Sequence, residues 1–247
     1  MKVRIDKLLV ERKLTPSRER AQALVLAGRV LVNGQKVEKA GAGVDSDADI
    51  RLLGGDLKYV SRGGLKLEAA LRNWKVDVTG KICMDVGAST GGFTDCLLQQ
   101  GAARVIAVDT GYGQIDLRVR QDSRVRLLEK TNARYLKPAD IGEAVDLVVV
   151  DVSFISATLV LPAVVASAFS VPERTGKEVV VLVKPQFEVG RERVGKGGIV
   201  RDEAGQQEAV EKVRAALQEL GCARTEVMES PILGAEGNRE FLLYAVF

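Results

Sequence analysis

From residue 65 onward the chain alternates between short continuous apolar runs and longer segments in which apolar residues recur every three or four positions. Continuous apolar runs of about four to eight residues are typical of buried strands, and the longer spacing is typical of helices that pack one face on a core. The predicted strands are 81–86, 103–108, 126–130, 146–150, 178–183, 223–228 and 240–246, and the predicted helices are 65–74, 92–100, 157–168 and 202–220. Strands that alternate with helices predict an α/β fold with a parallel sheet wound on both faces, whose ligand lies at the carboxyl ends of the strands.

The first part of the chain has a different pattern, which predicts a small α+β domain. The predicted elements are a helix at 4–13, a second helix that ends at Gly28, a hairpin at 30–37 and a strand at 49–52. Either Thr15 or Ser17 can cap the second helix, because both side chains accept backbone N–H groups at a helix start. Asn33-Gly34 between two apolar segments is the strongest short-range signal for a hairpin.

We therefore divide the chain into a domain at 1–58, a linker at 59–64 and a domain at 65–247. The chain has 36 Lys and Arg residues against 33 Asp and Glu residues, but the excess is uneven. Residues 1–62 contain 13 Lys and Arg against 8 Asp and Glu. Because the positive excess is confined to the first domain, a polyanionic partner is expected to bind there.

The composition excludes several classes of protein. The chain has no histidine, which removes Ser–His–Asp and Cys–His mechanisms and most zinc sites, and no metal site is predicted. Cys83, Cys96 and Cys222 form no C-x-x-C pair, and this sparse, odd count is typical of a reducing compartment. Neither a signal-peptide pattern nor an apolar run long enough to span a bilayer is present. We expect a cytoplasmic protein with no membrane partner.

A glycine-rich turn follows Asp85, the last polar residue of an apolar run. Its glycines are Gly87, Gly91 and Gly92, and a helical pattern follows them. Strand, glycine turn and helix bring bare backbone N–H groups and a helix N-terminus up to a ligand. A nicotinamide dinucleotide is disfavoured, because its fingerprint requires a glycine where Ser89 stands. Asp109 ends the next apolar run and is placed to reach a pair of ribose hydroxyls.

Four charged residues have distinctive neighbours: Lys66 in Gly-Gly-Leu-Lys-Leu-Glu, Asp151 in Val-Asp-Val-Ser-Phe-Ile-Ser, Lys184 in Val-Lys-Pro-Gln-Phe-Glu, and Glu240 in Gly-Asn-Arg-Glu. Lys184 directly follows five apolar residues, so its ammonium group is expected to need a carboxylate partner. Asp85, Asp109, Asp151 and Lys184 all lie at the ends of predicted strands. In a parallel sheet they would meet at one edge.

Residues 3 to about 52 resemble the small RNA-binding module first seen in ribosomal protein S-four. The resemblance rests on the string Ser-Arg-x-x-Ala-x-x-Leu-x-x-x-Gly-x-Val-x-Val-Asn-Gly, which starts at Ser17. It implies that several basic side chains line one surface and contact RNA phosphates, where each contact adds salt dependence. The candidates are Arg4, Lys7, Arg12, Lys13, Arg18, Arg20 and Arg29.

The string Asp85-Val-Gly-Ala-Ser-Thr-Gly-Gly-Phe-Thr-Asp95 resembles the first motif of class I methyltransferases, which bind S-adenosylmethionine (SAM). The order Lys66, Asp151, Lys184, Glu240 resembles the tetrad of FtsJ-type ribose 2′-O-methyltransferases. Residues 3–247 as a whole resemble the TlyA family of rRNA methyltransferases, which also carries the label haemolysin. The resemblance implies a Rossmann-like, doubly wound and mostly parallel seven-stranded sheet, SAM as cofactor, and ribosomal RNA or ribosomal subunits as partner. The implied reaction is 2′-O-methylation of cytidines.

The resemblance also implies roles for single residues. Lys184 is the candidate base for the ribose hydroxyl, and Asp151 and Glu240 would hold the ammonium groups of Lys184 and Lys66. The residues expected around SAM are Asp85, Gly87, Ala88, Ser89, Gly91, Gly92, Phe93, Asp109, Tyr112, Asn132 and Asp151. Two alternatives stay open, a protein that binds RNA and SAM without transfer, and a membrane-active haemolysin. The intact tetrad argues against the first, and the missing membrane segments argue against the second.

Overall fold

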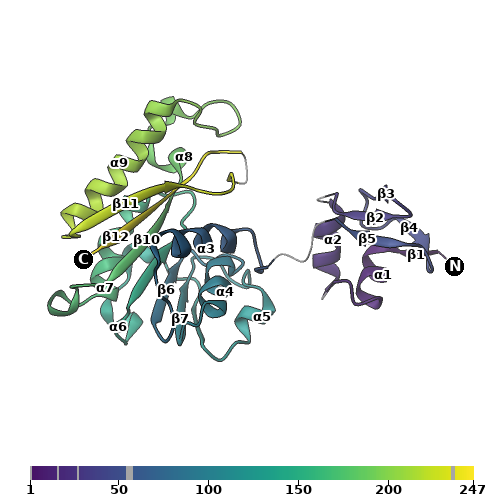
Figure 1. Ribbon diagram of the computed structural model, residues 1–247, viewed down its shortest axis with the longest axis horizontal. Helices are drawn as coiled ribbons and strands as arrows, with labels where there is room; N and C mark the ends of the chain where they lie inside the picture. Colours follow the sequence, from purple (N-terminus) through teal and green to yellow (C-terminus); the bar gives the residue numbers. More distant parts are fainter. Residues whose placement is uncertain (1, 16, 27, 54–57, 235–236) are drawn as a thin grey trace. The chain divides into compact units, whose positions relative to one another are not determined.

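The computed structural model describes residues 2–15, 17–26, 28–53, 58–234 and 237–247, and the chain divides into two compact units, Met1–Leu57 and Lys58–Phe247 (Figure 1). Each unit has its own hydrophobic core. In the first unit the core is built around Ile5, Leu9 and Val25, and in the second it follows the two faces of a large sheet. The two units are described separately below.

The elements of the first unit are β1 (Lys2–Arg4), α1 (Ile5–Glu11), α2 (Arg18–Leu26), β2 (Val30–Val32), β3 (Gln35–Lys36), β4 (Gly43–Asp45) and β5 (Ile50–Leu52). The predicted hairpin and the following strand are confirmed, since β2 pairs with both β3 and β5. Asn33 and Gly34 both have positive φ, as a tight type I′ turn requires. Ser17 caps α2 by accepting the Arg20 N–H at 3.2 Å. The β1–β4 pair was not predicted, because three residues are too few for an alternating pattern.

The described residues of the second unit form a seven-stranded sheet in the order β11-β12-β10-β9-β6-β7-β8. Its strands are β6 (Ile82–Val86), β7 (Arg104–Val108), β8 (Val125–Leu128), β9 (Leu147–Val150), β10 (Glu178–Val183), β11 (Arg224–Glu229) and β12 (Phe241–Val246). β12 runs antiparallel to β10 and β11, and the remaining pairs are parallel. The predicted doubly wound, mostly parallel α/β fold is confirmed.

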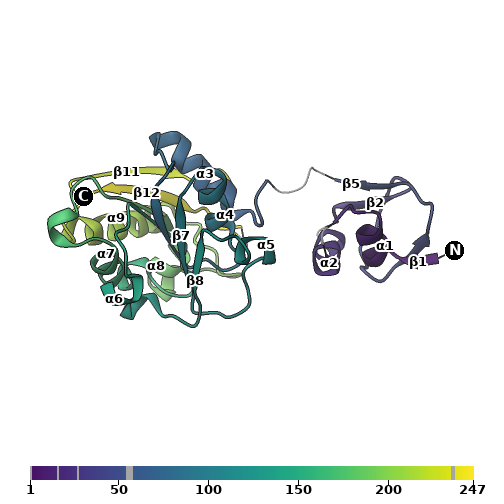
Figure 2. The ribbon, with the colours of Figure 1, turned by 90° about the horizontal axis from the view of Figure 1, so that it is seen from below.

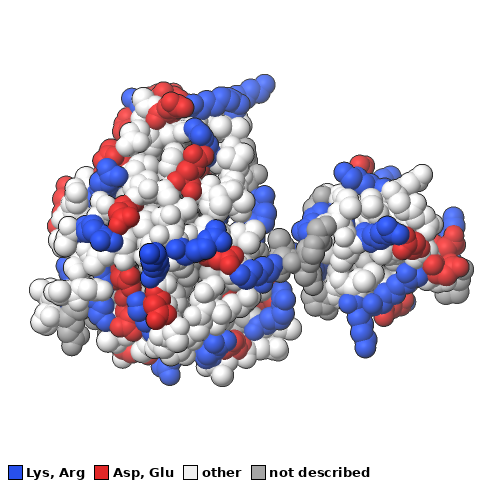
Figure 3. Space-filling model, in the orientation of Figure 1, with Lys and Arg blue, Asp and Glu red and all other residues white. Residues whose placement is uncertain are grey.

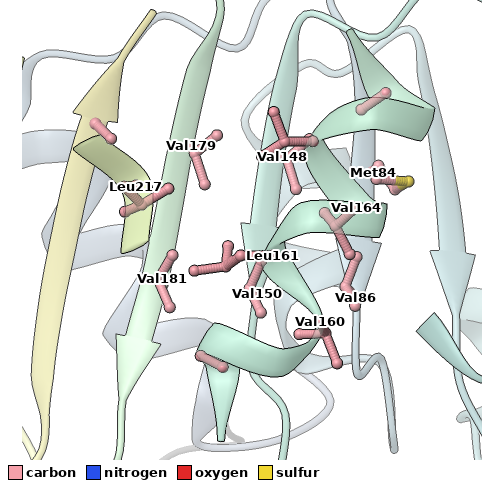
Figure 4. Packing of buried hydrophobic residues seen from close by; sticks show 14 of the residues in the cluster. Met84, Val86, Val148, Val150, Val160, Leu161, Val164, Val179, Val181 and Leu217 are labelled. Carbon is pink, nitrogen blue, oxygen red and sulfur yellow. The ribbon is translucent and has the colours of Figure 1, made fainter. Parts of the chain in front are cut away.

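Helices cover both faces of this sheet, because alternate residues of each buried strand point to opposite sides. On one face, α3 (Gly63–Trp74) and α4 (Gly92–Gln99) pack on residues such as Cys83 and Val149 (Figure 2). On the other, α7 (Leu161–Ala168) and α9 (Glu203–Glu219) pack on the intervening residues. Figure 4 shows Leu161 of α7 beside Val150 and Val181 of the sheet, and Val164 beside Val86.

Some predicted elements differ from the structure in detail. The helix predicted at 157–168 is divided into a 3-10 turn at Ala157–Leu159 and α7, because Pro162 has no N–H to donate and is confined to a first helical turn. β8 was expected to be buried, but it is an edge strand and half-buried. The one-turn helices α5 (Leu117–Arg120), α6 (Pro138–Ile141) and α8 (Pro185–Glu188) were not predicted, because a single turn shows no periodicity.

The predicted linker at 59–64 lies inside the second unit. Tyr59 is only 1% exposed and belongs to the core beneath α3 and α4. A Cβ atom on Gly64 would come within 2.3 Å of the Tyr59 side chain, so the tyrosine and the first turn of α3 fit only with a glycine at position 64. The boundary between the units therefore falls earlier, after Leu57.

Candidate active site

The strand ends bring four charged residues to one edge of the sheet. Asp151 follows β9 and Lys184 follows β10, and these strands are parallel neighbours, so both side chains leave the sheet at the same edge. Glu240 precedes β12, which is antiparallel to β10 and pairs Phe241 with Val183. Antiparallel pairing therefore sets Glu240 beside the end of β10. Lys66 reaches this edge from the first turn of α3.

The four residues form two ion pairs. Lys184 Nζ lies 2.6 Å from Asp151 Oδ1 and donates a hydrogen bond to Ser153 Oγ at 2.7 Å. Lys66 Nζ donates to Glu240 Oε2, and both of these side chains are buried. Each ammonium group thus has a carboxylate partner, as burial of a charge requires.

Lys66 lies off the apolar stripe of α3, yet it is only 8% exposed. The stripe of α3, which includes Leu67 and Leu71, packs on the sheet. The adjacent face carries Lys66 and is closed by Glu240. An isolated helical pattern does not predict this burial, because the covering residue, Glu240, lies just before β12 and 174 positions later in the chain.

Two pockets lie on either side of the lysines and share Lys66, Lys184 and Ser153 in their walls. The first, of about 250 Å³, is lined mainly by the glycine-rich turn and is called the glycine-side pocket. The second, of about 300 Å³, is lined by Phe154 and Phe187 and is called the aromatic-side pocket. The lysines therefore stand where a group in one pocket can meet a group in the other.

The glycine-side pocket has bare backbone in its wall because side chains do not fit there. Gly87 has φ +88°, and a Cβ atom on it would come within 2.4 Å of the Asp151 carbonyl oxygen. A Cβ atom on Gly92 would come within 2.1 Å of Ser61 Oγ. Of the other residues expected around SAM, Ala88, Ser89, Phe93 and Asp151 also line this pocket. Gly91 precedes α4 in a left-handed conformation and is not in the pocket wall.

Asp85 lies under the glycine turn and is fully buried. Thr94 Oγ1 donates to Asp85 Oδ2 at 2.6 Å, whereas Oδ1 has no hydrogen-bond partner in the described part of the chain. Burial raises the pKa of this carboxyl to about 7, against the lowering effect of the Thr94 hydrogen bond. Asp85 is not in the pocket wall, so its charge acts on the pocket through space.

The residues predicted around an adenosine group lie along the next two loops. Asp109 accepts the Ser89 N–H at 2.7 Å and the Gly111 N–H at 2.6 Å, which ties it to the glycine turn. Tyr112 is largely exposed, and Lys130 Nζ lies 4.4 Å from the centre of its ring. Asn132 caps a 3-10 turn and lines a separate hollow beside β8. Asp109 is thus bonded to the glycine turn, but, like Tyr112 and Asn132, it does not line the glycine-side pocket.

Sequence reasoning missed the aromatic wall of the second pocket. Phe154 is 92% exposed and has φ +65°, a conformation that bulky residues rarely adopt. Its ring centre is 5.4 Å from that of Phe187, with the planes tilted by 52°. A signal was present, because a phenylalanine stands three positions beyond each of Asp151 and Lys184. A pattern of apolar residues predicts that such side chains lie in the core, whereas Phe154 faces solvent.

A family model for FtsJ-like methyltransferases matches residues 59–247, and a model for the S4 domain matches residues 3–50. The chain belongs to the FtsJ-like methyltransferase family. It is 45% identical over 244 residues to the Mycobacterium tuberculosis 16S/23S rRNA (cytidine-2′-O)-methyltransferase TlyA, covering 98% of this chain and 89% of that protein.

Solved structures agree with this assignment. A hemolysin-named protein from Streptococcus thermophilus has a TM-score of 0.76 and 44% identity, covering 99% of this chain and 88% of that one. An S-adenosylmethionine-dependent methyltransferase from Mesorhizobium loti shares the fold alone, with a TM-score of 0.51 and 16% identity over 72% of this chain and 96% of that one. The FtsJ-like domain therefore has the fold of SAM-dependent methyltransferases, and the predicted resemblance to the TlyA family is confirmed.

The basic residues of the S4 domain differ in how they are held. Arg4 and Arg18 both bind the buried carboxylate of Asp6, at 2.8 and 3.2 Å, and stay about half exposed. The Arg4 guanidinium holds the pKa of Asp6 well below its usual range. Arg12 instead donates to the carbonyl oxygens of Ser46 and Ala48, which ties α1 to a loop. Arg4 and Arg18 are thus presented outward, whereas Arg12 has a structural role.

The remaining candidates for RNA contact lie on the same small unit. Lys7 is 3.6 Å from Glu11, Arg29 donates to the Leu53 carbonyl oxygen at 2.9 Å, and Lys13 is left-handed just after α1. Arg20 lies in the first turn of α2. Figure 3 shows Lys and Arg side chains spread over the visible face of this unit.

Neither a membrane span nor a metal cluster is found among the residues that the structure describes. No helix there is long and apolar enough to cross a membrane. Nor does any group of three or more Cys, Asp or Glu side chains in the described ranges come together as metal ligands.

Proposed function

We propose that this FtsJ-like methyltransferase transfers the methyl group of SAM to the ribose 2′-hydroxyl of a cytidine in ribosomal RNA. The observation that carries the proposal is the position of two Lys–carboxylate pairs between the glycine-side and aromatic-side pockets. The activity named for the M. tuberculosis relative supports the choice of substrate. A ribosomal substrate agrees with the predicted cytoplasmic location.

The glycine-side pocket fits SAM. The backbone of Ala88, Ser89 and Gly92, at the N-terminus of α4, is suited to a carboxylate such as that of the methionine group. Asp109 can also accept hydrogen bonds from ribose hydroxyls, since a carboxylate has lone pairs left after accepting the Ser89 and Gly111 N–H groups. Tyr112 and Asn132, on the loops after β7 and β8, are the candidates to flank the adenine. When bound, SAM supplies a methyl group that its sulfonium centre already activates.

The lysines supply what the ribose hydroxyl needs. Lys184 Nζ is held by Asp151 and Ser153, so its remaining bonding direction can meet a 2′-oxygen. We assign removal of the hydroxyl proton to the Lys184–Asp151 pair, because the chain has no histidine. Asp151 Oδ1 takes one proton from the Lys184 ammonium group, and the amine nitrogen that this leaves takes the proton of the ribose hydroxyl. Lys66, fixed by Glu240, supplies a second positive charge that favours the developing alkoxide. Holding the hydroxyl in line with the methyl group contributes further acceleration.

The aromatic-side pocket is suited to a nucleotide turned out of its helix. Exposed rings bind unstacked bases, and sequence-specific RNA recognition commonly uses such stacking. Phe154 and Phe187 lie in the same pocket as Lys184, so a base stacked there would bring its ribose to the lysine. The S4 domain would add phosphate contacts through residues such as Arg4 and Arg18, which position the RNA without reading its sequence.

The proposal is tested by incubating the protein with labelled SAM and ribosomal subunits from cells that lack the modification. We expect label in rRNA, with none in DNA of equal length or in protein. SAM binding without transfer to subunits or free rRNA would contradict the proposal and favour a binding-only protein. Lysis of lipid vesicles by the pure protein would instead favour the haemolysin alternative.

Asp85 is expected to make the stability of the cofactor-free protein depend on pH. Its folded pKa of about 7 lies above the usual value near 4, so between these values the folded state binds more protons. Stability therefore falls as pH rises through this interval, by roughly 4 kcal/mol at most. Thermal melting should show the decrease, and Asp85→Asn should remove most of it. Burial also raises the pKa of Glu188, so Glu188 contributes to the decrease in stability as well. Only the part of the decrease that Asp85→Asn removes is assigned to Asp85.

The same measurement with SAM tests the fit of the cofactor. SAM brings an ammonium and a sulfonium group near Asp85, and positive charge favours the ionised carboxylate. We therefore expect the increase in melting temperature caused by SAM to grow as pH rises through about 7. An increase that is independent of pH in the wild type would contradict this placement of SAM.

A further inference from the structure

Two segments of the active site are joined at both of their ends. One runs from Asp151 to Ser156 after β9, and the other from Lys184 to Glu188 after β10. At the first end Lys184 contacts Asp151 and Ser153. At the second end Glu188 accepts hydrogen bonds from Ser156 Oγ and from the Ala157 N–H, the latter at 2.7 Å.

Glu188 is only 5% exposed and does not line either pocket. The groups that face its carboxylate are Ser156 and Ala157 from the first segment and Lys212 from α9, whose Nζ is 4.0 Å away. Lys212 also donates to the backbone carbonyl oxygen of Glu188 at 2.7 Å. A buried carboxylate that lines neither pocket is expected to have a structural role, and the groups that it binds show which parts of the chain it fixes.

Phe154 lies in the middle of the first segment, between the two joined ends. Its φ of +65° is a conformation that bulky residues rarely adopt, and such a conformation persists only where surrounding contacts enforce it. Ser153 on one side is bonded to Lys184, and Ser156 on the other is bonded to Glu188. The same helix turn that carries Glu188 carries Phe187, the ring beside Phe154.

We propose that Glu188 is a positioning residue that holds Phe154 and Phe187 together as a stacking surface for the target base, next to Lys184. The inference rests on the proposed function. It assigns to Glu188 an indirect effect on the reaction, through the positions of Phe154 and Phe187. Its carboxylate fixes the second end of the segment, so Phe154 keeps its exposed, left-handed conformation before RNA arrives. A surface that is organised in advance binds a base with less ordering of side chains.

The test is a double-mutant cycle of Glu188→Ala with Phe154→Leu, measured both on methyl transfer and on affinity for ribosomal subunits. Base–aromatic stacking predicts that Phe154→Leu alone lowers kcat/KM for RNA by about 10- to 100-fold. We expect Glu188→Ala alone to have a similar effect, with SAM affinity within about twofold of the wild type. In the Glu188→Ala protein, Phe154→Leu should have little further effect. Glu188→Gln should retain most activity, because its amide oxygen can still accept the Ala157 N–H.

Glu178→Ala is the matched control, because Glu178 is a poorly exposed carboxylate at the opposite end of β10, paired with Lys81 and bonded to Tyr244. In the Glu178→Ala protein, Phe154→Leu should lower kcat/KM for RNA as much as it does in the wild type. The assignment would be overturned if the Glu188→Ala and Phe154→Leu losses in kcat/KM were additive. It would also be overturned if Glu188→Ala lowered SAM affinity as much as it lowered kcat/KM. A wild type that binds subunits without transferring methyl would contradict the proposed function, and the affinity cycle would still decide the role of Glu188.

Discussion

Replacing Lys184 with alanine is expected to lower kcat for methyl transfer by about 10²- to 10⁴-fold, the usual contribution of a positioned general acid or base. The change removes the ammonium group that meets Asp151 and Ser153 and the atom assigned to the hydroxyl proton. SAM affinity should change little. Single-turnover transfer to ribosomal subunits, with SAM affinity from calorimetry, measures both quantities. Lys177→Ala is the matched control, since Lys177 pairs with Asp146 at 2.8 Å at the other end of the same strand.

Lys184→Arg separates the two roles of the lysine. Arginine keeps the positive charge beside Asp151 but cannot accept a proton, because its pKa exceeds about 12 in proteins. If proton acceptance matters most, the arginine variant should be about as slow as the alanine variant. Substantial activity in Lys184→Arg would show that charge and alignment suffice. Full activity in Lys184→Ala would remove the residue from the mechanism.

A protein that begins at Lys58 and lacks the S4 domain is expected to bind SAM normally and to lose about 10²- to 10³-fold in kcat/KM for ribosomal subunits. The expectation follows from the two separate cores and from the position of the glycine-side pocket, whose walls come from the second unit alone. Lys58 is the first residue of that unit, and Tyr59 has to be kept because it is part of its core.

The salt dependence of binding gives a second measure of the S4 domain. Phosphate contacts release counterions, so the full chain should lose affinity for subunits more steeply with salt than the truncated protein does. Arg4→Ala with Arg18→Ala in the full chain should reproduce part of the reduced slope, because both side chains are presented outward by Asp6. Equal affinity and equal slope in the full and truncated proteins would contradict the role given to this domain.

The features that the sequence predicted correctly are local in the chain. Strand, glycine turn and helix are continuous from β6 to α4, so Asp85, Gly87 and Gly92 could be placed before the structure was known. The hairpin at Asn33-Gly34 is local in the same way, since two residues with positive φ determine the turn. Asp151 and Lys184 also follow from their own strands, because parallel neighbours end at one edge.

The features that could not be predicted depend on distant contacts. The pairing of Lys66 with Glu240 depends on the register of β12 against β10, which no pattern in either segment specifies. The burial of Tyr59 depends on its contact with the first turn of α3 and on the cluster beneath that helix, and so residues 59–64 resembled a linker. The exposure of Phe154 depends on hydrogen bonds at both ends of its segment. An apolar side chain alone does not reveal that it faces solvent.

The most direct test of the central claim is to locate the methyl group on the RNA. After reaction with ribosomal subunits, the rRNA is digested to nucleosides and analysed by mass spectrometry. The two pockets on either side of Lys184 predict a methyl group on the ribose, and the activity named for the M. tuberculosis relative predicts cytidine as the nucleoside. In 2′-O-methylcytidine the extra mass stays with the ribose when the glycosidic bond breaks. A methyl group that stays with the base would contradict the account, because it would require an acceptor atom other than the ribose hydroxyl at Lys184.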